Sequence, residues 1–351
     1  MKPASAFARL FGTLALAAAV GAGCGGESSE GPPAVDASGA VDASNNPGVD
    51  AGSECDDPCL APPEHGFQVG STGTTIQPGE DVEYCETVLI PGDASDTYYV
   101  KRFESQMTLG SHHLIVQAAA VGSDVEAALP EPGEPWPCTG PMGPQGEGGA
   151  GIFSTELLPV TGAQHPYHEE TFPDGVGRIY HGGQKLIFDY HYLNVTDAPL
   201  PARALVNFHT ADPSEVQIEA RDFAFMNFNI PTPAHQDSSF TKSCQFSADV
   251  MVYKLIRHTH QWGTDFTAWY DGGDQDGEEI FTTPNYETTD FIFSEPVMIP
   301  AGQGFTWQCN YHNDTERELH FGTEATDEMC ILFGVWWPVD PNAEVGFQGC
   351  F

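Results

Sequence analysis

Residues 250–263 read Val-Met-Val-Tyr-Lys-Leu-Ile-Arg-His-Thr-His-Gln-Trp-Gly. The apolar run from Val250 to Ile256 predicts a buried strand, in which residues two positions apart project from the same face. His258 and His260 are therefore expected to point the same way. Two neutral imidazoles side by side on a rigid element make half of a metal site for copper, zinc, iron or nickel. On this stretch alone, two unrelated polar residues at a strand end are an equally good interpretation.

The rest of the chain has the character of a β protein. Its 351 residues include 38 glycines and 28 prolines, which favour short strands and turns over long helices. Runs rich in β-branched and aromatic residues predict strands at 96–103, 113–118, 185–192, 221–230, 248–256, 265–270, 291–293, 305–309 and 329–337. The Pro- and Gly-rich region from Leu129 to Gly183 is predicted to be a long loop. We predict an all-β fold of two consecutive antiparallel β-sandwich domains, jelly-roll-like in character.

The two domains are expected to meet near the turn at residues 211–214, Ala-Asp-Pro-Ser, within about ten residues. The first sandwich would then span residues 55–212 and the second residues 213–351. A chain of this length with 40% hydrophobic residues is able to bury two such cores.

The first 54 residues carry targeting and linker signals rather than folded structure. Lys2 and Arg9 precede a short apolar stretch, and small residues then lead to Cys24, which predicts a signal peptide over residues 1–24. This pattern resembles a bacterial lipoprotein cleavage site with a lipid on Cys24; simple cleavage near Ala22 is the alternative. Residues 25–54 repeat Ala-Val-Asp-Ala-Ser and predict a flexible linker. The protein is expected to be exported, as a periplasmic or cell-surface lipoprotein or otherwise as a secreted protein.

The charge balance excludes two classes of partner. There are 12 Lys and Arg residues against 50 Asp and Glu residues, and the formal net charge is -38. Such a surface repels nucleic-acid phosphates and anionic lipid headgroups, so the only membrane contact we expect is a lipid on Cys24. A soluble acidic surface explains the charge most simply, and we expect a monomer whose partners are small molecules.

Eight cysteines remain once Cys24 is set aside, at positions 55, 59, 85, 138, 244, 309, 330 and 350. In an exported chain an even number of cysteines predicts disulfides. Eight cysteines allow about 105 connectivities, and the sequence alone does not choose among them. Cys138 lies within the predicted long loop, where it would serve as a staple.

Three further histidines lie beside apolar strand residues that could fix their rings. His112 and His113 open the run Leu-Ile-Val at residues 114–116, and His191 lies within the strand predicted at 185–192. Neighbouring strand residues face opposite ways, so His112 and His113 can share a metal only if the strand bends or begins there. Asp189 shares a face with His191 and would either orient a ring or be an ordinary exposed aspartate.

Four motifs together resemble one family. His112-His113, His191 in Asp-Tyr-His-Tyr, His258-Thr259-His260 and Asp327-Glu328-Met329-Cys330 resemble, in order and spacing, the copper type II, ascorbate-dependent monooxygenases. That family includes peptidylglycine α-hydroxylating monooxygenase and dopamine β-monooxygenase, and the resemblance covers roughly residues 85–350.

The resemblance implies two copper ions in an oxidoreductase that uses O2, with ascorbate as electron donor. By position, His112, His113 and His191 match the ligands of the electron-transfer copper in the first domain. His258, His260 and Met329 match the ligands of the oxygen-binding, hydroxylating copper in the second. A thioether ligand suits Cu(I) and has little use for zinc.

The resemblance also implies three disulfides, which are Cys85–Cys138, Cys244–Cys350 and Cys309–Cys330. Cys55 and Cys59 are left over, and we pair them with each other.

The chain departs from the peptide-amidating members around the substrate. Those members hold a peptide carboxylate with an Arg two residues before the His-Thr-His motif and with Asn and Tyr just after the Met-Cys pair. This chain has Ile256, Ile331 and Phe333 there, and apolar side chains cannot neutralise a carboxylate. Arg257 should face away from Ile256. The resemblance therefore predicts hydroxylation of a small or apolar substrate, with Phe333, Trp336 and Trp337 near the pocket unless those rings are core.

Two other functions remain open from the sequence. A copper-binding lipoprotein that buffers or delivers copper without turnover would keep every ligand. A zinc hydrolase is disfavoured, because no Glu stands as a clear general base beside His258 or His260.

Overall fold

The computed structural model describes residues 58–138, 156–284, 290–322, 326–340, 342–343 and 348–350. The predicted signal peptide with Cys24, the linker and Cys55 lie outside these residues. The described regular structure is β-strand except for the helix α1 (Asp124–Ala128) and two 3-10 turns, Pro213–Glu215 and Gly273–Gln275. The predicted all-β class is confirmed. No helix among the described residues is long and apolar enough to cross a membrane.

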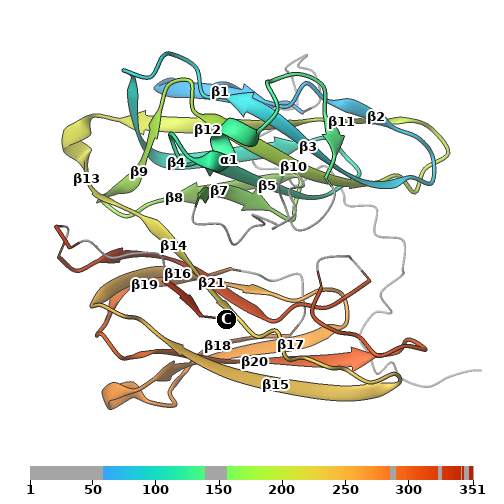
Figure 1. Cartoon of the computed structure of the whole chain (residues 1–351), viewed down its shortest axis with the longest axis vertical. Helices are drawn as coiled ribbons and strands as arrows, with labels where there is room; N and C mark the ends of the chain where they lie inside the picture. The colour runs from blue at the N-terminus through green and yellow to red at the C-terminus, as the bar shows by residue number, and fades with distance from the viewer. Residues whose placement is uncertain are drawn as a thin grey trace, which may run out of the picture. The chain divides into compact units, whose positions relative to one another are not determined.

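The first sandwich pairs two sheets face to face (Figure 1). One sheet has the order β1 (Gly66–Gly70), β12 (Ala204–Ala211), β4 (Thr97–Met107), β9 (Gly175–His181) and β13 (Val216–Glu219), with β8 (Tyr167–Thr171) also paired to β4. The other has the order β6 (Trp136–Pro137), β3 (Asp81–Leu89), β10 (Lys185–Leu193), β5 (Ser111–Ala119) and β7 (Leu157–Ala163). A short ladder joins β2 (Thr74–Ile76) to β11 (Leu200–Ala202).

Strand alternation builds the core between these sheets. Leu114 and Val116 of β5 are fully buried with Phe188 of β10, and they meet Phe103 of β4 and Phe208 of β12 in one cluster. The rings of Phe103 and Phe208 stand edge to face with centroids 5.1 Å apart. Because burying each such side chain contributes about 1.5–3 kcal/mol, this cluster fixes β5 and β10, the two strands that carry His112, His113 and His191.

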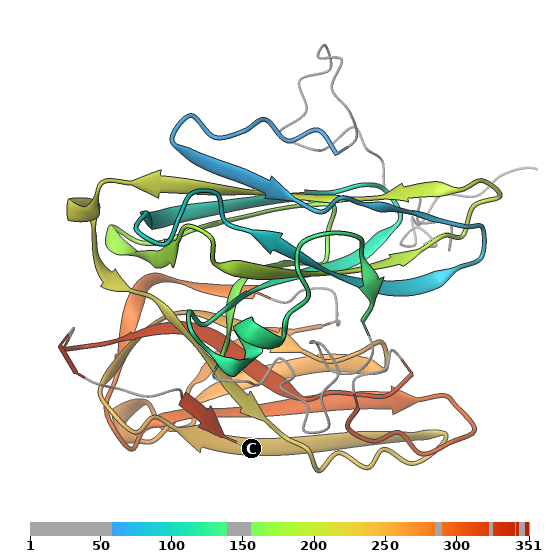
Figure 2. The same cartoon turned by 45° about the horizontal axis from the view of Figure 1, so that its top comes forward.

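The second sandwich also has two layers (Figure 1 and Figure 2). One sheet has the order β19 (Asp290–Ile299), β16 (Val250–His258), β21 (Ile331–Pro338), β14 (Arg221–Met226) and β22 (Gln348–Cys350). The other has the order β15 (Gln236–Gln245), β20 (Gly304–Asn313), β17 (Gly263–Asp271) and β18 (Glu279–Thr283). The core between them is rich in aromatic rings, such as Phe225 of β14 stacked on Trp307 of β20 at 6.2 Å.

The predicted long loop from Leu129 to Gly183 is wrong over much of its length. Strands β7, β8 and β9 all lie within it, while residues 139–155 lie outside the described part of the chain. These strands have weak local signals, because β7 contains Pro159 and Gly162 and β8 contains adjacent glutamates. They form by pairing with β5 and β4 rather than through intrinsic strand preference.

The three disulfides implied by the family resemblance are confirmed. Cys85 pairs with Cys138, Cys244 with Cys350, and Cys309 with Cys330, with Cα separations of 5.0, 6.0 and 5.9 Å. The bond from Cys244 closes a loop of 106 residues, for which the chain-entropy model gives about 4–5 kcal/mol. Cys55 lies outside the described residues, so its pairing with Cys59 stays a prediction.

Strand pairing passes from one sandwich to the other at Ala220. β13 pairs with β9 of the first sandwich, and β14 begins at the next residue and pairs with β21 of the second. Arg178 of β9 binds Asp222 of β14 through two contacts of 2.6 and 2.8 Å, and both groups are largely buried. The change of pairing therefore comes a few residues after the predicted turn at 211–214.

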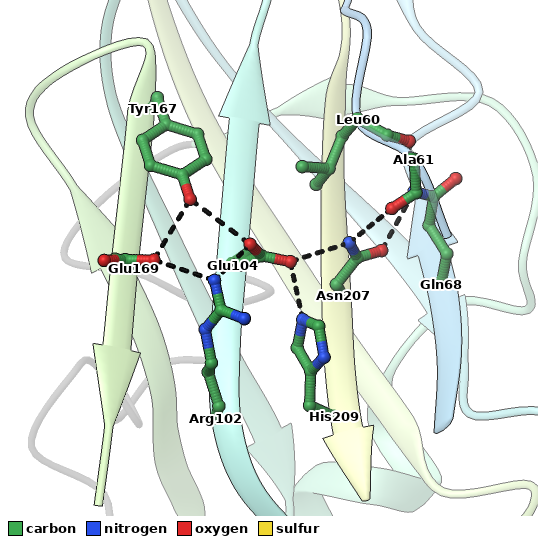
Figure 3. Close-up of polar contacts among 9 residues, drawn as sticks. All are labelled: Leu60, Ala61, Gln68, Arg102, Glu104, Tyr167, Glu169, Asn207 and His209. Carbon is green, nitrogen blue, oxygen red and sulfur yellow. Dashed lines mark hydrogen bonds and ion pairs between the residues drawn. The ribbon is translucent and has the colours of Figure 1, made fainter. Parts of the chain in front are cut away.

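A strip of polar side chains crosses four strands of the first sheet (Figure 3). Its centre is Glu104 of β4, which accepts hydrogen bonds from Arg102, Tyr167, Asn207 and His209. Arg102 also reaches Glu169 of β8, while Asn207 and Gln68 donate to the carbonyl oxygens of Ala61 and Leu60, each at 2.8 Å. This Glu104 strip fastens the segment that leads into β1 onto the sheet.

Candidate metal centres

Three histidines converge on the first sandwich from two neighbouring strands. His113 of β5 lies directly opposite His191 of β10, and the register shifts by one residue beyond that pair, so that Tyr192 faces Ser111. His112 is thus the extra residue of a β-bulge, and a bulge turns a neighbouring side chain toward the same side. Gly110, with a φ of 86°, precedes it. The bend that a shared metal would require is therefore present. The centroids of the three rings are 5.0–5.4 Å apart.

The ring nitrogens are arranged as a metal would require. His113 Nε2 lies 3.3 Å from Glu83 Oε1, and His191 Nε2 lies 2.5 Å from Asp81 Oδ1. Each contact leaves the Nδ1 atom of its ring free. His112 Nδ1 and His113 Nδ1 are 3.2 Å apart, and two nitrogens bound tetrahedrally to one ion at about 2.0 Å would be about 3.3 Å apart. One ligand atom from each histidine lies within 4.8 Å of the other two.

The electrostatics keep this cluster ready for a cation. Partial burial and the neighbouring His113 and His191 rings lower the pKa of His112 to about 4. Burial would raise the pKa of Glu83, but the hydrogen bond and the charge of His113 outweigh it and lower that pKa. An ionised carboxylate that contacts a ring nitrogen is the usual partner that orients a histidine ligand.

Asp189 is not an exposed strand residue, so that alternative is wrong. Its side chain is 2% exposed and faces Glu83 and His113. Burial and the charge of Glu83 raise the pKa of Asp189 well above its ordinary value. Asp189 is therefore a buried acid beside Glu83 and His113 rather than a solvent-exposed residue.

The second histidine pair lies where the predicted strand ends. β16 ends at His258, and His260 lies in the following turn rather than on the strand. The two rings are nevertheless neighbours, with centroids 5.3 Å apart and planes at 88°. His260 Nδ1 donates to the Asp327 carbonyl oxygen at 2.9 Å, which leaves Nε2 free. Burial is the main cause that lowers the pKa of His260 and places that of His258 well below its ordinary value.

Glu328 joins this pair to Met329. Its carboxylate is fully buried and accepts backbone N–H bonds from His260, Trp262 and Met329 at 2.9, 2.9 and 3.2 Å. Burial raises the pKa of Glu328 to about 7, although the three N–H donors and the charge of Arg257 oppose that rise. The turn that carries His260 and the chain that carries Met329 are thus held by one side chain.

Met329 itself is 4% exposed and packs with Ala224, Met226 and Ile331. Its carbonyl oxygen accepts a hydrogen bond from the Tyr311 hydroxyl at 2.7 Å. The residue is therefore positioned from both its amide and its carbonyl, in addition to its packing.

The surroundings of His258 are apolar. The Phe333 ring centroid lies 6.4 Å from that of His258, and Ile256 precedes it on the same face of β16. Arg257 is completely buried and donates to Thr259 Oγ1 at 2.9 Å. Trp336 and Trp337 belong to the two hydrophobic cores, so of the three predicted pocket rings only Phe333 lies beside the site.

Sequence reasoning identified the six candidate ligands but missed the carboxylates that orient them. Asp81 and Glu83 lie on β3, and their contacts depend on the register of β3 against β10. Glu328 lies within the motif Asp327-Glu328-Met329-Cys330, but two of its three backbone contacts depend on a turn 66 to 68 residues away in sequence. The alternation of acidic residues just before Cys85 was the one visible signal.

A cavity of about 300 Å³ lies elsewhere in the second sandwich. Its lining includes Tyr270, Asp271, Met298 and Gln303. None of its lining residues belongs to either histidine cluster, so neither cluster borders it.

Residues 226–351 match the family model of the copper type II ascorbate-dependent monooxygenase, C-terminal domain. The search of curated proteins found no match.

Several solved structures are similar to the chain at low identity. They include PNGF-II (9% identity, 78% of this chain and 65% of that chain, TM-score 0.29) and a structure of the infectious bursal disease virus Gx strain (8%, 79% and 71%, TM-score 0.14). The coconut allergen cocosin is a third (8%, 78% and 85%, TM-score 0.14). The chain thus spans about 65% of the length of PNGF-II. With such low TM-scores, these similarities carry no inference about function.

Proposed function

We propose that the protein hydroxylates a C–H bond of a small or apolar substrate, because residues 226–351 match the family model of the copper type II ascorbate-dependent monooxygenase, C-terminal domain. O2 and a one-electron donor such as ascorbate would be the co-substrates. The observation that carries this proposal is the joining of Met329 to the His258–His260 turn by Glu328. A soft thioether beside two neutral imidazoles is a donor set suited to copper.

The two residue sets fit two copper ions. His112, His113 and His191 would hold one ion through their free nitrogens, which already face one another. His258, His260 and Met329 would hold the other. Copper, changing between Cu(I) and Cu(II), would supply the two electrons with which O2 gives one oxygen atom to the substrate and one to water. The protein's own part is to fix the free nitrogens of the rings and to hold Met329 in place.

The residues around His258 favour an uncharged substrate. Ile256 and Phe333 offer apolar contact, and Arg257 is turned into the core, where it binds Thr259. A substrate carboxylate would lose its hydration here and gain no cation, at a cost of several kcal/mol. We therefore propose that the substrate is not a glycine-extended peptide.

The disulfides and the family support export, since disulfides persist in oxidising compartments. A lipid on Cys24 and a monomeric state belong to the same proposal. Mass spectrometry of the N-terminal peptide from the producing cell would test the lipid.

The test of the activity is a Met329→Ile variant, loaded with copper and screened against small apolar substrates with ascorbate. We expect loss of at least about 100-fold in hydroxylation, because the branched side chain fills the space without a sulfur ligand. Met298→Ile, at a methionine that is 55% exposed, is the control and should keep full activity. Full activity in Met329→Ile would contradict the assignment of Met329 as a copper ligand.

Copper buffering without turnover is the rival function. Every candidate ligand would be kept under either function, so the ligands do not decide between the two. Oxygen consumption driven by ascorbate and stimulated by a substrate decides between the two. A zinc hydrolase gains nothing from Glu328, because its carboxylate is fully buried and occupied by three backbone donors.

A further inference from the structure

Two carboxylates from one strand reach the three-histidine cluster. Asp81 and Glu83 are alternate residues of β3, so they project from the same face beside β10. Glu83 lies opposite His191 in the register but contacts His113, one strand further on, at 3.3 Å. Asp81 contacts His191 at 2.5 Å. The Nε2 atoms of His113 and His191 therefore each contact their own carboxylate.

These contacts select the tautomer of both rings. A carboxylate accepts a proton from Nε2, so the lone pair remains on Nδ1, and the ring plane is fixed by the same contact. Nδ1 is also the atom through which His112 and His113 approach each other at 3.2 Å. The carboxylates thus aim lone pairs at the centre of the cluster before any ion arrives.

The two candidate sites differ in what contacts their ring nitrogens. At the first, carboxylates of Asp81 and Glu83 contact ring nitrogens of His191 and His113 directly. At the second, His260 Nδ1 donates to a neutral carbonyl oxygen, the contacts of Glu328 are to backbone N–H groups, and Met329 is uncharged. Negative charge stabilises Cu(II) relative to Cu(I), whereas a thioether favours Cu(I).

We propose that Asp81 and Glu83 are positioning residues that lock the His191 and His113 rings and lower the reduction potential of the first copper below that of the second. This inference rests on the proposed function for the identity of the metal. A copper ion held by His112, His113 and His191 would then give up an electron more readily than one held by His258, His260 and Met329.

The test compares Asp81→Asn and Glu83→Gln with the native chain, each as the full protein loaded with copper. Redox titration followed by the Cu(II) electron paramagnetic resonance signal gives one potential for each site, and His191→Ala identifies which signal is the first. We expect each variant to raise the potential of the first copper only. A tenfold change in the ratio of Cu(II) to Cu(I) affinity corresponds to about 59 mV. Cu(II) affinity at that site should fall about 10–100-fold.

The matched control is Asp237→Asn. Asp237 Oδ1 contacts His312 Nδ1 at 2.7 Å, so this variant removes the same kind of contact outside both clusters and should change neither potential. Asp81→Glu keeps the charge and should restore most of the native potential. Circular dichroism checks that each variant is folded.

Two results separate the possible failures. If the potentials of Asp81→Asn and Glu83→Gln stay within about 20 mV of native and their Cu(II) affinities within about twofold, the positioning role is wrong while the copper assignment stands. If His191→Ala binds as much copper as the native chain, the three-histidine site itself is wrong, and the proposed function fails with it.

Discussion

At the level of single residues, Glu328 does the most to shape the second histidine site. Its side chain is fully buried and has no charged partner at hydrogen-bonding distance among the described contacts, yet it accepts three backbone N–H groups from two segments distant in sequence. Buried N–H groups without an acceptor cost about 1–3 kcal/mol each. Glu328 is therefore both a stability determinant and the residue that sets the distance between His260 and Met329.

Replacing Glu328 by Ala should lower the free energy of unfolding by at least about 3 kcal/mol, because three N–H groups lose their acceptor. Copper affinity at the second site should fall, and that at the first should not. Urea denaturation and copper titration measure the two effects. Glu316→Ala, at a side chain that is 96% exposed, is the control and should stay within about 0.5 kcal/mol of native. Unchanged copper affinity at both sites in Glu328→Ala would contradict this role.

The sequence predicts the candidate ligands but not the carboxylates that contact them. The histidines and Met329 could be identified because their order and spacing match a family, and the structure brings the first three into one cluster. Asp81, Glu83 and Glu328 could not, because each contact depends on a strand register or a turn that local sequence does not encode.

At the level of elements, side-chain hydrogen bonds between neighbouring strands stabilise the first sheet. The Glu104 strip links β8, β4, β12 and β1 and holds the backbone of Leu60 and Ala61 (Figure 3). Strands with strong β-branched and aromatic runs, such as β10 and β16, were predictable from local sequence. β7 and β8 were not, because partners rather than propensity hold them in place.

Glu104→Gln should destabilise the first sandwich in a pH-dependent way. Burial would raise the pKa of Glu104, but hydrogen bonds from Asn207 and His209 and the charge of Arg102 lower it overall. Its contribution is therefore complete above the ordinary pKa of a glutamate and is lost as pH falls through the lowered folded value.

Urea denaturation at pH 7 should show a loss of about 1.5–3 kcal/mol in Glu104→Gln, the range for hydrogen bonds to a charged group. In strong acid the native and variant stabilities should converge. Glu169→Gln, at a side chain that is 55% exposed, should lose less, up to about 1 kcal/mol. A constant difference between native and Glu104→Gln at all pH values would refute the ionic role of the strip.

At the level of the whole molecule, each sandwich carries one set of candidate copper ligands. Its all-β class and three disulfides were predictable, the class from composition and turn residues and the disulfides from family resemblance. The change of strand pairing at Ala220 was not predictable. β13 follows the predicted domain boundary in sequence but pairs with β9 of the first sandwich. The central claim is that the two sets bind copper separately and that only the second supplies sulfur.

X-ray absorption at the copper edge of the reduced, copper-loaded protein tests that claim most directly. We predict two copper ions per chain, with a sulfur neighbour for half of them. Met329→Ile should lose the sulfur signal, whereas His113→Ala should lose one copper and keep the sulfur. A native spectrum with nitrogen neighbours alone, or a sulfur signal that persists in Met329→Ile, would contradict the account.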